Sequence, residues 1–103
     1  MAIVKDIEII AQKYAELIRK EINPKTVYLY GSFAKGNNNE DSDIDIAVVA
    51  DDFTGDPVED RLKLMRIRRK VDTRIEPHPF CSSDFKLSNP FVREIIETGI
   101  KIM

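Results

Sequence analysis

Apolar residues recur every three or four positions through the first part of the chain. The positions with this spacing are Ile3, Ile7, Ile10, Ala11, Tyr14, Leu17, Ile18 and Ile22. Their period predicts an amphipathic helix over residues 2–22, with one wide apolar face that covers a sheet. Arg19 and Lys20 lie in its last turns, where the helix dipole favours cations, and Asn23-Pro24 ends it.

Two short apolar runs follow, and both have the composition of buried strands. Residues 27–30 (VYLY) are β-branched, aromatic or aliphatic, and Gly31-Ser32 breaks this run. Residues 43–49 (DIDIAVV) form the second run, after a polar loop over residues 37–42. The pattern predicts two neighbouring strands joined by a turn and a loop.

The second run begins with alternating acids and isoleucines. Because side chains on a strand alternate between its faces, Asp43 and Asp45 should point the same way while Ile44 and Ile46 enter the core. Two carboxylates on one face can bridge a pair of divalent cations about 3.5–4 Å apart. Without a cation, their mutual repulsion would be costly. The alternative is a hairpin with a solvated acidic turn.

The rest of the chain predicts two further helices and one strand. Asp56 and Asn89 each precede a proline, which is typical of a helix N-cap, and Gly99 follows the last helix. The first of these helices ends in basic residues over 66–70, where the dipole favours cations. Residues 73–78 have strand character, and the prolines within and after them are expected either at an edge of the sheet or at the end of this strand. Ile100, Ile102 and Met103 are expected to pack back on the domain or on a partner.

The Gly-Ser turn has the chemistry of a phosphate site. Gly31 permits close approach of a triphosphate to the backbone, and Ser32 opens a helical turn whose free N–H groups favour anions. Lys35 can reach the same phosphates, although a lysine in a turn commonly faces solvent. We therefore take Gly31, Ser32, Lys35 and Ser42 as candidate nucleotide-binding residues.

The order Gly31-Ser32, ten residues, then Asp43-Ile44-Asp45 resembles the signature of the polymerase-β-like nucleotidyltransferases. It is most similar to their smallest branch, the minimal nucleotidyltransferase (MNT) domains, and the resemblance covers essentially the whole chain. It implies an α/β (α+β) fold, with a small mixed sheet and helices mainly on one face. We expect a single domain over residues 1–103.

The resemblance also implies a third carboxylate on the neighbouring strand, completing a site for two Mg²⁺ or Mn²⁺ ions. Two candidates are present, Glu76 in the body of the strand and Asp72 at its entrance, and we favour Glu76. The family more usually has Asp in this role, so the longer side chain is a departure. The implied reaction moves a nucleoside monophosphate, with ATP the expected donor, to a hydroxyl group.

The composition indicates which binding partners and which cellular compartment to expect for this protein. The net charge of −2 lacks the basic excess of a nucleic-acid-binding protein, which disfavours a template-directed polymerase. A lone cysteine, Cys81, fits a reducing cytoplasm, and no apolar run has the length of a membrane span. His78 is the only histidine, and with Cys81 it is too little for a zinc site.

We expect the acceptor to come from a partner, because the sequence offers no second domain to bind one. The resemblance implies a HEPN ribonuclease, since MNT proteins are often antitoxins that adenylylate such a toxin. Two alternatives stay open: a non-catalytic adaptor that binds metal and nucleotide, and a small-molecule nucleotidyltransferase with a separate substrate-binding subunit. Self-association is also possible.

Overall fold

The computed structural model describes residues 2–39 and 41–103. In chain order, the elements are α1 (Ala2–Glu21), β1 (Pro24–Tyr30), α2 (Ser32–Lys35), β2 (Ile44–Ala50), α3 (Pro57–Arg68), β3 (Ile75–Cys81), a 3-10 turn (Ser82–Asp84), α4 (Pro90–Thr98) and β4 (Ile100–Lys101). None of the helices in the described ranges is long and apolar enough to cross a membrane.

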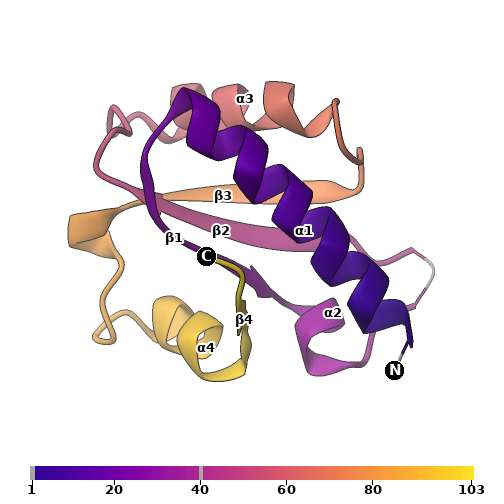
Figure 1. Cartoon of the computed structure of the whole chain (residues 1–103). Helices are drawn as coiled ribbons and strands as arrows, with labels where there is room; N and C mark the ends of the chain where they lie inside the picture. Colours follow the sequence, from indigo (N-terminus) through magenta and orange to yellow (C-terminus); the bar gives the residue numbers. More distant parts are fainter. Residues whose placement is uncertain (1, 40) are drawn as a thin grey trace.

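The four strands form one mixed sheet in the order β3-β2-β1-β4 (Figure 1). The β1–β2 and β1–β4 pairs are antiparallel, whereas β2 and β3 are parallel. A parallel pair needs a crossover connection, and α3 supplies it. The expected mixed α/β fold is confirmed. The short strand β4 was not predicted, although the apolar residues after Gly99 do return to the domain, as expected.

The two long helices, α1 and α3, lie on the same face of the sheet (Figure 1). The buried side chains beneath them include Val27 and Leu29 of β1, Ile44, Ile46 and Val48 of β2, and Ile75 of β3. Tyr14 of α1 is fully buried and its hydroxyl donates a 2.6 Å hydrogen bond to the carbonyl oxygen of Leu64 in α3. This bond ties the two helices together over the main core.

The opposite face of the sheet is covered only in part, by α4. Ile95 of α4 packs against Tyr30 of β1 and Ala47 of β2, both of which point away from the main core. The helices therefore lie mainly on one face, as predicted, and the β2–β3 side of the other face is left more accessible.

Local signals fixed the helix ends. The Asp56 side chain accepts hydrogen bonds from the backbone N–H groups of Val58 and Glu59, and Asn89 accepts one from Phe91. Gly99 ends α4, and its N–H donates to the carbonyl oxygen of Ile95. These three boundary predictions are confirmed.

The strand β3 departs from its predicted bounds, because it begins two residues later and runs through both prolines to Cys81. It lies at the sheet edge, which is one of the two alternatives predicted. The Ile44 N–H donates to the Arg74 carbonyl, so the backbone groups of Arg74 and of every second residue after it point toward β2. The backbone groups of Ile75, Pro77 and Pro79 point instead toward the open edge of the sheet. A proline there removes no ladder bond, so the strand continues.

Candidate active site

Asp45 lies where the β1–β2 hairpin meets the Gly-Ser turn. In the ladder it is opposite Tyr30, the last residue of β1, and Gly31 follows directly. Gly31 has φ +79°, and a Cβ at this position would overlap the Asp45 carboxylate. Two features favour glycine at position 31: the positive φ of its backbone, and the space that the Asp45 carboxylate occupies.

Asp45 is also the meeting point of the predicted carboxylates. The parallel β2–β3 ladder pairs it with Glu76, so both side chains emerge on the same face of the sheet. Asp43 lies just before β2, which begins at Ile44 rather than at Asp43 as predicted. Burial, followed by the negative charges of Asp43 and Glu76, raises the pKa of Asp45 to about 6.

Glu76 is held by two arginines of α3. Arg61 Nη2 donates a 2.6 Å hydrogen bond to Glu76 Oε2, and Arg68 Nη1 lies 3.6 Å from Oε1. Arg68 also donates to the carbonyl oxygen of Ile75 at 2.8 Å. Arg61 was not singled out from the sequence, and Arg68 was assigned only to the basic end of the helix. Their seven-residue spacing, which is two helical turns, was the available signal that they share one face of α3.

Asp72, the other candidate for third carboxylate, lies in the turn before β3. Its side chain accepts hydrogen bonds from the backbone N–H and the guanidinium of Arg74. The hydrogen bond from the Arg74 side chain lowers the pKa of Asp72. The sheet thus brings Glu76, and not Asp72, opposite Asp45; the catalytic role of Glu76 stays a prediction.

The donor chemistry of this cluster suits a hard divalent cation. Carboxylate oxygens are the ligands that Mg²⁺ prefers, and a cation would relieve both the burial of Asp45 and the negative charges of Asp43 and Glu76, which together raise its pKa. Within the described ranges, no three His, Cys, Asp or Glu side chains lie close enough together to hold an ion. Glu76, engaged by Arg61, would have to turn toward the aspartates to complete such a set.

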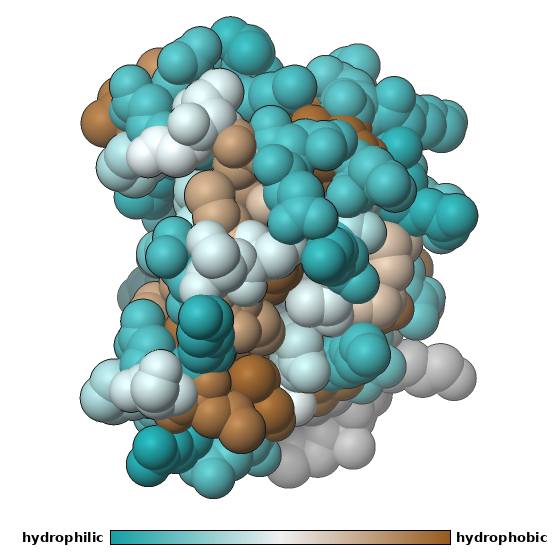
Figure 2. Space-filling view, turned by 90° about the vertical axis from the view of Figure 1, so that its left-hand side faces the viewer, coloured by the Kyte–Doolittle hydropathy of each residue, from teal (hydrophilic) through white to brown (hydrophobic). Residues whose placement is uncertain are grey.

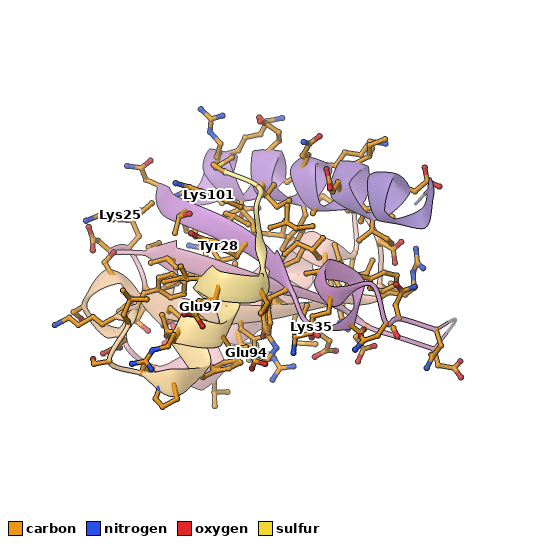
Figure 3. The ribbon with its side chains drawn as sticks, turned by 90° about the horizontal axis from the view of Figure 1, so that it is seen from below. Lys25, Tyr28, Lys35, Glu94, Glu97 and Lys101 are labelled. Carbon is orange, nitrogen blue, oxygen red and sulfur yellow. The ribbon has the colours of Figure 1, made fainter. Side chains whose placement is uncertain are left out.

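The remaining predicted nucleotide-binding residues lie around the turn. Ser32 is the first residue of α2. Lys35, at the other end of α2, forms a 2.8 Å ion pair with Glu94 of α4, and Figure 3 shows the two side chains near one another below the sheet. Ser42 Oγ accepts a hydrogen bond from the Asn39 N–H and so closes the loop before β2. Their roles in nucleotide binding stay predictions.

His78 belongs to the same face as Glu76, two residues along β3. Its Nε2 is 3.9 Å from Asp45 Oδ1, and its ring lies edge-on to Tyr30, with the ring centres 5.7 Å apart. Burial, and then the charge of Arg61, lower the pKa of His78, so it is neutral at pH 7. A lone histidine on a strand is usually structural, but the alternation of His78 with Glu76 along the strand indicated that they share a face.

Aromatic rings continue from Tyr30 and His78 across this face. Phe91 of α4 lies 5.7 Å from Tyr30, and Phe80 lies 5.9 Å from Phe91 and 5.3 Å from Phe85, measured between ring centres. Phe91 is 43% exposed. The carboxylate cluster therefore borders an aromatic surface.

Asp51 and Asp52, after β2, are exposed and lie outside the cluster. Asp51 pairs with Lys25 at 3.2 Å, and Asp52 accepts a hydrogen bond from the Asn23 N–H at 3.0 Å. A different acid, Asp60, is buried, and it accepts hydrogen bonds from Thr54 and Gly55 that hold the loop before α3. These residues support the fold rather than the site.

Comparison of the sequence with known protein families identifies the family to which this chain belongs. The sequence profile of the family described as "Polymerase beta, Nucleotidyltransferase" matches residues 12–103. The chain belongs to this family. It is therefore a nucleotidyltransferase, as the Gly-Ser and Asp-Ile-Asp motifs predicted.

A relative in Methanocaldococcus jannaschii, named "Putative protein adenylyltransferase MJ1379", is 26% identical over 97% of each chain. A crystal structure of a toxin-antitoxin with AMP-PNP has a TM-score of 0.66 at 22% identity, covering 89% of this chain and 72% of its own. A structure of a mutant MntA-HpeT toxin-antitoxin also has a TM-score of 0.66, at 22% identity and 88% and 70% coverage. The two structural likenesses establish that this nucleotidyltransferase shares the fold of those chains.

Proposed function

We propose that this nucleotidyltransferase transfers AMP from ATP to a hydroxyl group of a protein partner. The observation that carries the proposal is the placement of Asp45 against the Gly31 turn and opposite Glu76 in the β2–β3 ladder, with Asp43 two residues before it. The name of the M. jannaschii relative supports transfer of an adenylyl group to protein. The AMP-PNP of the similar toxin-antitoxin structure supports an adenine nucleotide as donor.

Asp43, Asp45 and Glu76 are the residues that would hold Mg²⁺. When bound, the ion would neutralise the triphosphate and the departing pyrophosphate. The backbone N–H groups at Gly31 and Ser32 bind the β- and γ-phosphates in this proposal, and Lys35 can add a positive charge if it leaves Glu94. These contacts orient the α-phosphorus toward the open face of the sheet.

The transfer itself is a displacement at that phosphorus. The acceptor oxygen forms a bond to the α-phosphorus, the bond from this phosphorus to the bridging oxygen breaks, and pyrophosphate leaves. Glu76, as general base, accepts the proton of the acceptor hydroxyl. Positioning of the acceptor supplies much of the rate enhancement, so the surface that receives it matters as much as the base.

A protein acceptor suits the surface beside the carboxylates. Phe91 and Leu87, at the start of α4 and before it, are 43% and 56% exposed. In Figure 2 most of the visible face is hydrophilic, and hydrophobic residues gather low in the view, at the height of α4. A folded partner that covers this surface would exclude water from the reaction. A HEPN-type ribonuclease is the partner we propose, and an adenylylated tyrosine near its active site would repel RNA phosphates.

The test is to purify the protein together with its cellular partner, add each nucleoside triphosphate with MgCl₂, and measure intact masses. We expect the partner to gain one AMP with ATP, and the Asp45→Asn variant to give no adduct. Adducts confined to small alcohols or sugars would favour the small-molecule alternative. Nucleotide binding without any transfer would favour the non-catalytic adaptor.

A further inference from the structure

The two arginines that hold Glu76 differ in how firmly they are fixed. Arg68 is 21% exposed in its side chain and also donates to the Ile75 carbonyl, which anchors it to the sheet edge. Arg61 is 42% exposed, and its shorter contact, 2.6 Å, is with Glu76 Oε2. Its Nε is buried without a hydrogen-bond partner among the described residues. Arg61 is thus the more readily released of the two.

The Arg61 guanidinium lies on the face of the sheet that carries the carboxylates. It is hydrogen-bonded to Glu76, which the β2–β3 ladder pairs with Asp45. His78 and Tyr30, which flank Asp45, lie on the same face. A guanidinium released from Glu76 would therefore already be beside the place where Asp45 and Gly31 receive the triphosphate.

A divalent cation and Arg61 would compete for the same carboxylate. A cation held by Asp45 and Glu76 repels a guanidinium bonded to Glu76, and it supplies the charge compensation that Arg61 provided. The freed guanidinium has a fork of donors that matches the oxygens of a phosphate group. The same residue can therefore serve the site in two successive arrangements.

We propose that Arg61 is a nucleotide-positioning residue that holds Glu76 while the metal site is empty and turns to the triphosphate when metal and nucleotide bind. This inference rests on the proposed function, because it takes Glu76 as a metal ligand. It assigns a role to α3, which neither the Gly-Ser turn nor the Asp-Ile-Asp motif includes. Arg68, anchored at the Ile75 carbonyl, stays near Glu76 when Arg61 leaves it.

The two arrangements predict effects of opposite sign in an Arg61→Gln variant. Mn²⁺ binding without nucleotide should become about two- to fivefold tighter, because Glu76 no longer has to leave an ion pair of the strength found near surfaces. Binding of an ATP analogue with a methylene group between the α- and β-phosphorus atoms, in the presence of Mg²⁺, should weaken about tenfold or more, because a charge-assisted contact is lost. A purely structural role for Arg61 would shift both affinities in the same direction.

Mn²⁺ binding is measured by electron paramagnetic resonance and analogue binding by calorimetry, on the full chain. Arg66→Gln is the matched control, because Arg66 is exposed in the last turn of α3 and its substitution changes the net charge equally. Thermal unfolding checks that each variant is folded. An Arg61→Lys variant keeps the positive charge but lacks the planar set of guanidinium donors. Arg61→Lys should retain Mn²⁺ affinity near that of the wild type and still bind the analogue less tightly.

Unchanged or weaker Mn²⁺ binding by Arg61→Gln would overturn the inference, as would unchanged analogue binding. Asp45→Asn separates this outcome from failure of the proposed function. If Asp45→Asn abolishes Mn²⁺ binding while Arg61→Gln has no effect, the metal site stands and the role of Arg61 is wrong. If Asp45→Asn leaves Mn²⁺ binding intact, the metal site itself is wrong.

Discussion

Replacing Asp45 with Asn should make the metal-free protein more stable, although Asp45 is the residue most needed for activity. Asp45 is 29% exposed in its side chain, and burial, followed by the negative charges of Asp43 and Glu76, raises its pKa from 3.8 to about 6. Folding therefore disfavours the ionised form. Asn has nearly the same shape and no charge, so the variant escapes this cost.

The size and pH range of the effect follow from the shift. Each pKa unit corresponds to about 1.4 kcal/mol, so the shift of about two units sets an upper limit of about 3 kcal/mol, and partial exposure reduces it to about 1–2 kcal/mol. Because the folded-state pKa is raised, this group destabilises the fold above about pH 6. The cost disappears as the pH falls below 3.8, where Asp45 is protonated in both states.

The assay is urea unfolding in EDTA, at pH 7.5 and near pH 4. Asp45→Asn should have the higher unfolding free energy at pH 7.5, with most of the difference gone at the lower pH. The control is Asp51→Asn, an exposed aspartate that pairs with Lys25 at 3.2 Å, and it should give no stabilisation. With MgATP the order should reverse, since the wild type gains about 2.7 kcal/mol at a hundredfold excess over its dissociation constant. If Asp45→Asn is no more stable than the wild type at pH 7.5 in EDTA, the argument from crowded carboxylates is refuted.

Three further predictions concern individual residues of the site. Glu76→Gln should lower the transfer rate about a hundredfold or more while retaining nucleotide affinity, and Asp72→Asn should change the rate by less than about twofold; single-turnover kinetics would expose the reverse order. Gly31→Ala and Gly36→Ala should each cost about 1–2 kcal/mol in urea unfolding because both residues have positive φ, but only Gly31→Ala, where the new Cβ meets a carboxylate, should lose Mn²⁺ binding. Lys35→Gln should weaken binding of the ATP analogue in calorimetry, and equal affinity would remove this lysine from the phosphate site.

The sequence by itself determined the features that depend on a few consecutive residues. The helix caps at Asp56 and Asn89 satisfy N–H groups only two or three positions away, and they were predicted correctly. The amphipathic period of the first helix and the motif that contains Gly31 and Asp45 are equally local. The edge position of β3 was one of the two alternatives that the sequence left open, because its prolines cannot donate to two neighbouring strands.

Only the tertiary structure decided which distant residues meet. The placement of Glu76 rather than Asp72 beside Asp45 depends on the register of two parallel strands joined through α3, and a shift of one residue would turn Glu76 to the other face. The ion pair of Glu76 with Arg61 joins a helix to an edge strand across fifteen residues of sequence. No local period specifies such a pair. It follows from the packing of α3 over the sheet, which brings Arg61 and Arg68 to the edge of the candidate site.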